Sequence, residues 1–272
     1  MNRDRDERVP DVSPFLWRWF SWYARRFLRK HFHAVRLARD VTPPDVPPDI
    51  PLVICANHPS WWDPMVAIFL SERLWPERRH YWPIDAEMLR KYRFFSRLGF
   101  FGVDQTPRGA AAFLRTAGAV CRRPNTAVWV TAEGEFSDVR RRPLRLRPGV
   151  AHLAQRLDHV IVLPLAAEYT FWGERTPEVL LRFGEPLAVG SSAGISKEHC
   201  HDALTTHLEA AMDALASSAI ARDAGAFETL LAGATGTGGV YDLWRRGVAR
   251  WRGERFDPDH MSGLATAGGD RA

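Results

Sequence analysis

A histidine and an aspartate in this chain are spaced for general-base chemistry. His58 and Asp63 lie five positions apart in the segment ANHPSWWD, directly after an apolar run that ends at Asn57. Because Pro64 follows Asp63, the backbone of Asp63 is restricted toward extended values, and a helix is expected to begin at the proline. One tight turn then separates the two side chains. A carboxylate on one ring nitrogen fixes the imidazole tautomer and increases the basicity of the other nitrogen, as a base that acts on an alcohol requires.

The same segment also allows a simpler interpretation. An aspartate before a proline is a favourable helix N-cap, so Asp63 could serve only to begin the helix. His58 could equally be a polar loop residue without a chemical role. The segment alone does not decide between a catalytic pair and ordinary loop and capping residues.

A second polar group follows another apolar run. Glu133 and Gly134 close the segment TAVWVTAEG, Ser137 follows, and five arginines then occur within eight residues: Arg140, Arg141, Arg142, Arg145 and Arg147. A guanidinium group binds phosphate or carboxylate through two parallel hydrogen bonds. The arginines could also form a solvated loop or contact nucleic acid. Their expected position beside His58 favours a role in holding phosphate.

Alternating apolar runs and helical patterns predict where these groups meet. Strands are expected at residues 51–57, 80–86, 99–104, 126–134, 159–170 and 178–187, and helices at 64–74, 88–97, 106–121, 149–157 and 197–220. This alternation predicts an α/β fold with a mostly parallel or mixed sheet flanked by helices. Since sites in such sheets form beyond the carboxyl ends of the strands, His58 and Glu133 are expected at the same edge.

Residues 14–33 combine aromatic and basic residues in a helical pattern. Leu16, Phe20, Tyr23 and Phe27 recur at helical spacing, while most of the arginines keep to another face. Rings at the acyl boundary and cations against headgroups are typical of a helix that lies on an anionic membrane surface. The alternative is a helix that packs on its own domain with its arginines in water. We favour the membrane surface because three tryptophans among these basic residues exceed what a core needs.

Composition divides the chain into four parts. Residues 1–13 form a polar lead that is expected to be disordered, and residues 14–50 hold the amphipathic helix and a stiff, proline-rich linker. Residues 51–220 are expected to form the α/β domain. Residues 221–272 are expected to be a helical extension and a disordered tail.

Charge, cysteine content and hydropathy indicate a location. The formal net charge of +5 and the pI of 9.4 suggest an anionic partner. Three cysteines without a CxxC pair favour a reducing compartment. The N-terminus lacks the apolar segment of a secretory signal, and no run approaches the roughly 18 apolar residues of a membrane span. We expect a cytoplasmic protein, peripheral on the cytoplasmic face of the membrane.

Four segments together resemble the motif blocks of the glycerolipid acyltransferase superfamily, the PlsC-like lysophospholipid acyltransferases. ANHPSWWD resembles its HX4D motif, and VTAEGEFSDVRRRPLRLRPGVAHLA resembles its proline-glutamate-glycine-threonine block with the residues that follow. GFFGVDQ at 99–105 resembles the block between these two, and VIVLPLAAEY resembles the last block. The four occur in the order of the family and cover residues 51–170.

The resemblance implies a role for each matching residue. His58 is expected to be the general base, Asp63 to orient it, Glu133 and Gly134 to shape the acceptor site, and Arg147 to hold a phosphate. The donor is expected to be acyl-CoA or acyl carrier protein as a co-substrate, and the acceptor a lipid hydroxyl. Transfer is expected to be direct, without an acyl-enzyme, bound cofactor or metal. The expected partners are these substrates and an anionic membrane surface, but no nucleic acid.

The sequence departs from the family pattern at four positions. Ala132, Glu135, Phe136 and Gln105 stand where the family usually has proline, threonine, arginine and arginine. The last two changes remove cations that commonly meet an acceptor phosphate. Other arginines could compensate, or the acceptor could be a glycolipid, an ornithine-type lipid or another hydroxylated lipid. The candidate substrate-binding residues are Asn57, Arg108, Glu133, Gly134, Ser137, Arg140, Arg145 and Arg147.

Two other classes of function remain as alternatives. A thioesterase or esterase usually needs a nucleophile, and no GxSxG motif occurs in the chain. A non-catalytic membrane or nucleic-acid binder would use the arginine and tryptophan surfaces alone. The histidines and the cysteine of residues 198–201 are adjacent on an expected helix, where neighbouring side chains point in different directions, so no metal site is expected.

Overall fold

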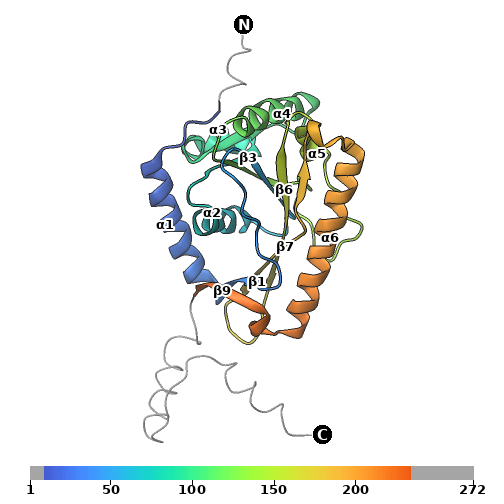
Figure 1. Ribbon diagram of the computed structural model, residues 1–272. Helices are drawn as coiled ribbons and strands as arrows, with labels where there is room; N and C mark the ends of the chain where they lie inside the picture. The colour runs from blue at the N-terminus through green and yellow to red at the C-terminus, as the bar shows by residue number, and fades with distance from the viewer. Residues whose placement is uncertain (1–8, 234–272) are drawn as a thin grey trace, which may run out of the picture.

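The apolar runs of the sequence pair into one nine-stranded sheet in the computed structural model, which describes residues 9–233 (Figure 1). The strands are β1 (Ala34–Ala38), β2 (Leu52–Ala56), β3 (Arg79–Asp85), β4 (Phe100–Val103), β5 (Thr126–Thr131), β6 (Val160–Thr170), β7 (Glu178–Phe183), β8 (Leu187–Val189) and β9 (Phe227–Ala232). The helices are α1 (Pro14–His31), α2 (Asp63–Leu74), α3 (Ala86–Lys91), α4 (Pro107–Cys121), α5 (Gly149–Ala154) and α6 (Lys197–Ala221), with 3-10 helices η1 (Arg93–Leu98), η2 (Ser191–Ala193) and η3 (Ala224–Ala226).

The centre of the sheet is parallel. The strand order is β4-β3-β5-β2-β6-β7-β1-β9, with β8 on β6, and β4, β3, β5, β2 and β6 all run in the same direction. Ala56 at the end of β2 is level with Thr131 of β5 and Leu165 of β6. The carboxyl ends of β2 and β5 therefore lie side by side. The predicted α/β class with a mostly parallel or mixed sheet is confirmed.

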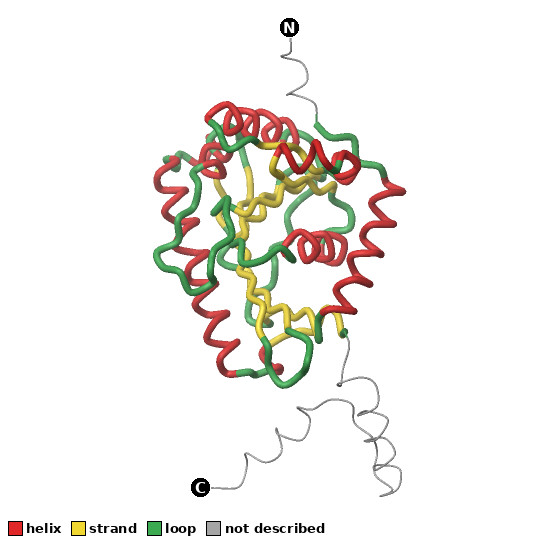
Figure 2. The backbone as a smooth tube through the Cα atoms, turned by 180° about the vertical axis from the view of Figure 1, so that it is seen from behind, coloured by secondary structure: helices red, strands yellow, loops and turns green. Residues whose placement is uncertain are grey.

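Helices cover both faces of the sheet because the buried strands are apolar on both sides. Leu52 and Ile54 of β2 pack into one core with α1 and α2, whereas Val53 and Cys55 pack into the other with α4, α5 and α6. Figure 2 shows the strands between these two layers of helices. No helix among the described residues has the length and apolar composition needed to cross a membrane.

Helix α1 has one face in the core and one face exposed. Ser13 caps its N-terminus and Pro14 occupies its first turn. Phe20, Ala24 and Leu28 are buried against the domain, and the helix contacts α2 and η1. The alternative interpretation, a helix that packs on its own domain, is thus correct for the inner face of α1. The other face is exposed and carries Trp19 and Trp22.

Two strands of the sheet lie outside the range expected for the α/β domain. β1 precedes the proline-rich segment and pairs with β7, and β9 follows α6 and pairs with β1 in antiparallel. The prediction of a helix after residue 221 is therefore wrong for residues 227–232, which form β9. They pair as a strand because the edge of β1 offers hydrogen bonds and because Phe227 and Leu231 pack into the core. The rest of the expected extension, residues 234–272, lies outside the described residues.

The proline-rich segment is fastened to the domain by a buried arginine. The guanidinium of Arg78 donates to the carbonyls of Val46, Pro47, Ile50 and Thr126 at 2.6 to 3.0 Å. These hydrogen bonds satisfy carbonyls that a proline-rich chain cannot pair in a ladder. The division expected at residue 50 therefore does not coincide with an edge of the folded unit.

Candidate active site

His58 and Asp63 meet beyond the carboxyl end of β2. His58 Nδ1 lies 2.6 Å from Asp63 Oδ2. Because an ionised carboxylate can only accept, Nδ1 carries the proton and Nε2 keeps its lone pair. The side chain of His58 is 18% exposed and that of Asp63 is 9% exposed. The imidazole is therefore reachable from outside while the carboxylate behind it is covered.

The carboxylate of Asp63 serves the imidazole and not the helix terminus. Helix α2 begins at Asp63, and its N-cap residue, Trp62, makes no side-chain capping hydrogen bond. Oδ2 of Asp63 also accepts from the backbone amide of Ser60 at 3.2 Å, and Oδ1 accepts from the hydroxyl of Tyr169 at 2.6 Å. Both oxygens are thus engaged, and the interpretation of Asp63 as only a capping residue is wrong.

Glu133 ties the loop that carries His58 to the neighbouring strand. It follows β5, and its Oε2 accepts from the backbone amide of His58 at 2.8 Å. The backbone amide of Ser137 donates to the carbonyl of His58 at 3.0 Å. The carboxylate of Glu133 is buried, so it holds the backbone on which the imidazole is mounted. The expectation that His58 and Glu133 lie at the same edge is confirmed.

An exposed aromatic ring, that of Phe136, lies beside the imidazole. The ring centroid of Phe136 lies 4.3 Å from that of His58, and Phe136 is 60% exposed. Trp61, in the loop between His58 and Asp63, is 65% exposed. The position at which the family block usually has a cation therefore carries an apolar ring in contact with His58.

Asn57 lies inside the sheet and not at its open edge. Its Nδ2 donates to the carbonyl of Ala167 at 3.0 Å, and its Oδ1 accepts from the amide of Ala167 at 2.8 Å. The residue is buried, and its amide group continues the pairing of β2 with β6 beyond the end of the ladder. This placement contradicts the expectation that Asn57 binds substrate, because both polar atoms are already used within the protein.

Acidic residues neutralise most of the arginine-rich loop. Arg140 pairs with Asp138 at 2.6 Å, Arg141 with Glu135 at 3.5 Å, and Arg142 with Asp213. The hydrogen bonds from Arg140 hold the pKa of the Asp138 carboxyl well below its usual range, so this pair stays ionised. Arg140 remains exposed, but part of its hydrogen-bonding capacity is committed. Arg145 and Arg108, the latter in the first turn of α4, are exposed and form no ion pair with a residue between 9 and 233.

Arg147 is placed over the glycine that follows Glu133. Gly134 has φ +69°, and a Cβ there would lie 2.3 Å from Arg147 Nε. The left-handed backbone conformation favours glycine at this position, and the guanidinium of Arg147 approaches it closely. Arg147 Nη1 donates to Gln105 Oε1, and Nη2 lies 3.4 Å from the carbonyl of Gly134. The structure thus brings together Gly134, Arg147 and Gln105, three positions that the sequence analysis singled out. At Gln105 an amide stands where the family usually has an arginine.

Tyr169 is a site residue that sequence reasoning missed. It lies in the last motif block, on β6, and it contacts Asp63 across 106 positions of the chain. No local spacing connects two residues so far apart. The available signal was topological, since β6 neighbours β2 and extends past its end.

The buried cysteines are poor candidates for a nucleophile. Cys55, Cys121 and Cys200 are free and buried. Burial, followed by the charge of Glu133, raises the pKa of the Cys55 thiol to about 12, so the reactive thiolate is scarce. Within residues 9–233, no three histidine, cysteine, aspartate or glutamate side chains gather in a group that could hold a metal ion.

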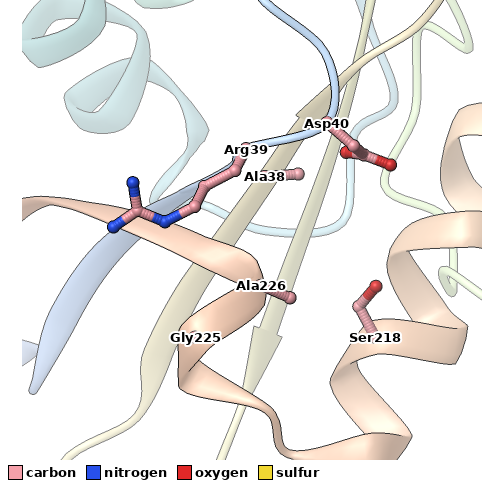
Figure 3. A pocket seen from close by; sticks show the side chains of 6 residues that line it. All are labelled: Ala38, Arg39, Asp40, Ser218, Gly225 and Ala226. Atoms are coloured by element: carbon pink, nitrogen blue, oxygen red, sulfur yellow. The ribbon is translucent and has the colours of Figure 1, made fainter.

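A separate cavity of about 340 Å³ lies at the end of β1 and beside the C-terminal part of α6 (Figure 3). Its lining residues are Ala38, Arg39, Asp40, Ser218, Gly225 and Ala226. β1 runs antiparallel to the central strands, through β7, so its end points away from the edge that carries His58. None of the lining residues belongs to the histidine–aspartate pair or its neighbours.

A comparison with protein families agrees with the motif blocks. The model of the family described as Acyltransferase matches residues 33–168, half of the chain. The matched span contains His58, Asp63, Glu133 and Arg147. No curated protein matches the chain. On the extent of the family match, the chain belongs to the Acyltransferase family and is an enzyme that transfers acyl groups.

Proposed function

We propose that this enzyme moves a fatty acyl group from an acyl thioester, carried by CoA or by acyl carrier protein, to a hydroxyl group of a lipid. Nε2 of His58 takes the proton of the acceptor hydroxyl, and the oxygen of that hydroxyl attacks the carbonyl carbon of the thioester. The carbon–sulfur bond then breaks, and the imidazolium returns the proton to the leaving thiolate. The products are an ester and a free thiol, and no acyl-enzyme forms.

The observation that carries this proposal is the contact of 2.6 Å between His58 Nδ1 and Asp63 Oδ2. It fixes the tautomer that leaves Nε2 as a proton acceptor, and it stabilises the imidazolium that forms when the proton is taken. A base held in this way contributes about 10²- to 10⁴-fold to a rate. The exposure of the imidazole gives an acceptor access to it.

The serines near His58 favour direct transfer over a covalent route. The Oγ of Ser60 accepts from the amide of Trp62 at 3.3 Å, and the Oγ of Ser137 is buried with no hydrogen-bond partner. Neither hydroxyl forms the hydrogen bond to His58 that activation of a serine nucleophile requires. The lipid hydroxyl is therefore the better partner for the base.

The exposed face of α1 supports work at an anionic membrane surface. Its outward aromatic residues are Phe15, Trp19, Trp22 and Tyr23, and its outward cations include Arg25, Arg26, Arg29 and Lys30. No acidic residue occurs in the sequence of α1. Rings of this kind enter the headgroup region while cations attract anionic lipid. We propose a peripheral position on the cytoplasmic face of the membrane.

The acceptor is expected to carry an anionic group that reaches Arg147 or Arg145. Arg147 lies beside Glu133 and Gly134, which join it to the loop of His58. Because Gln105 and Phe136 replace two cations, the site is expected to hold a phosphate less firmly than the family pattern implies. We therefore expect lysophosphatidate to be used more slowly than at least one lysolipid or hydroxylated lipid with a weaker anionic charge.

Acceptor dependence tests the reaction type. The purified enzyme is incubated with palmitoyl-CoA or palmitoyl-acyl carrier protein, alone and with detergent-dispersed lysophosphatidate, lysophosphatidylglycerol, lysophosphatidylethanolamine or an ornithine lipid. We expect release of free thiol only with an acceptor, together with a new diacylated product in mass spectra. Equal thiol release with and without every acceptor, accompanied by free palmitate, would identify a thioesterase and contradict the proposal.

A further inference from the structure

Tyr169 makes a contact that the proposed mechanism does not yet use. Its hydroxyl lies 2.6 Å from Asp63 Oδ1. The other carboxylate oxygen, Oδ2, is shared by His58 Nδ1 and the amide of Ser60. The Tyr169 hydroxyl therefore fixes the rotation of the Asp63 carboxylate from the side opposite His58.

The tyrosine can act only as a donor in this contact. Burial raises the pKa of Tyr169 well above its ordinary value of 10, and the charge of Asp63 and the hydrogen bond act in the same direction. The hydroxyl consequently stays protonated at neutral pH. An ionised carboxylate has no proton to offer, so the hydrogen runs from Tyr169 to Asp63.

The ring of Tyr169 is held independently of Asp63. It is mounted on β6, whose residues 165–170 pair with β7. Its ring centroid lies 5.8 Å from that of Phe32, which is itself buried and packs edge-on against Trp62, the residue before Asp63. The same aromatic residue thus supports both the tyrosine and the start of α2. The hydroxyl of Tyr169 is therefore held in place by its surroundings and can fix the orientation of the Asp63 carboxylate.

We propose that Tyr169 is a positioning residue for the general base: it holds Asp63 in the rotamer that orients His58. This inference rests on the proposed function, because it assigns Tyr169 to the same proton transfer. Tyr169 acts through Asp63 and is not expected to touch either substrate. Loss of the hydroxyl is therefore expected to lower kcat and to leave KM unchanged.

The test is Tyr169→Phe, which removes one oxygen and keeps the ring. The probe reaction is transfer from palmitoyl-CoA to the lysolipid that gives the fastest wild-type turnover. We expect kcat to fall about tenfold, the effect of losing one hydrogen bond to a charged group, with KM unchanged. Tyr81→Phe is the matched control, because it removes a hydroxyl from a buried tyrosine of β3. It should leave kcat at the wild-type value.

Repeating the Tyr169→Phe substitution in an Asp63→Asn enzyme distinguishes a role in positioning Asp63 from a general effect on the fold. In an Asp63→Asn enzyme, Tyr169→Phe should reduce kcat by less than twofold, since groups that act as a unit are not additive. An equal tenfold loss in both backgrounds would overturn the proposal, as would wild-type kcat in the single variant. If His58→Gln is inactive while Tyr169→Phe is fully active, only this inference fails. If His58→Gln is itself active, the proposed function fails.

Discussion

Two histidines of this chain share an aromatic environment and differ in what their nitrogens contact. Both ring nitrogens of His80, on β3, are occupied: Nε2 donates to the carbonyl of Trp75 at 2.9 Å, and Nδ1 accepts from Trp129 Nε1 at 3.0 Å. His80 is buried and stacks with Trp17. His58 has a carboxylate on Nδ1, whereas none of its recorded hydrogen bonds involves Nε2.

The comparison shows that burial and partner chemistry together distinguish a histidine that is held neutral from one whose Nδ1 faces a carboxylate. Burial of His80 disfavours its cation and outweighs the hydrogen bond to the Trp75 carbonyl, which favours it, and the charge of Arg78 acts in the same direction as burial. Burial therefore lowers the pKa of His80 to about 4, and the ring stays uncharged at neutral pH. The carboxylate of Asp63, by contrast, is the partner that an imidazolium needs during proton transfer.

The largest effect that would sharpen this contrast is expected from Asp63→Asn. The substitution keeps the shape of the side chain but removes the charge, and an amide can also present the wrong group to Nδ1. We expect kcat for acyl transfer to fall by about 10²- to 10³-fold, with the melting temperature within a few degrees of wild type. Retention of wild-type kcat would show that a carboxylate at position 63 is dispensable.

The second effect concerns acid stability and belongs to His80. Its pKa is about 4 in the folded chain and near 6.5 when unfolded, so between these values the unfolded chain binds more protons. The free energy of unfolding therefore decreases as pH falls from about 6.5 toward 4, and at pH 5 the contribution of His80 to this decrease is about 2 kcal/mol. Urea unfolding at pH 7 and pH 5 measures this loss.

His80→Gln is the control for the acid effect. The variant is expected to be less stable at pH 7, but it should lack the part of the pH dependence that His80 contributes. An identical dependence in wild type and variant would assign the acid sensitivity to other groups and weaken the contrast between the two histidines.

The smallest expected effect is on vesicle binding, and it comes from substitutions of the tryptophans of α1. Trp22 is 59% exposed, whereas Trp17 stacks against both His80 and Trp82. Trp22→Ala should weaken binding to vesicles of phosphatidylglycerol and phosphatidylcholine by roughly five- to tenfold and leave the melting temperature unchanged. Trp17→Ala should lower the melting temperature. Vesicle binding that is unchanged in Trp19→Ala, Trp22→Ala double variants would exclude this face as the membrane contact.

Point substitutions are the appropriate test of the helix because its inner face belongs to the core. Phe20, Ala24 and Leu28 are buried in the same cluster as Leu52 and Ile54 of β2. Removal of α1 would expose this cluster, so any loss of vesicle binding would be mixed with a loss of folding.

The parts of the site that the sequence predicted either lie close together in the chain or follow the ends of apolar runs. His58 and Asp63 are separated by one turn, and Glu133 ends an apolar run as His58 nearly does, so strand ends alone place them together. Residues joined only by tertiary structure were not predictable in this way. The contact of Tyr169 with Asp63 depends on how far β6 extends past β2.

Two further differences have the same origin. The expectation for Asn57 failed because the sequence does not tell whether a polar residue at a strand end faces the open edge or pairs with the next strand. β1 and β9 were not predicted because polar residues interrupt their apolar runs, Arg36 in β1 and Glu228 and Thr229 in β9, so that each pattern alone does not indicate a strand. The central strands were predictable since their apolar runs are continuous.

The most direct test of the account compares turnover of His58→Gln and His80→Gln under identical conditions, at pH 7.5 and at a temperature where both are folded. Acceptor-dependent formation of diacylated lipid from palmitoyl thioester is measured for each. We predict that His58→Gln loses at least about a hundredfold in kcat, whereas His80→Gln stays within about threefold of wild type. Comparable turnover in the two variants would contradict the assignment of His58 as the base.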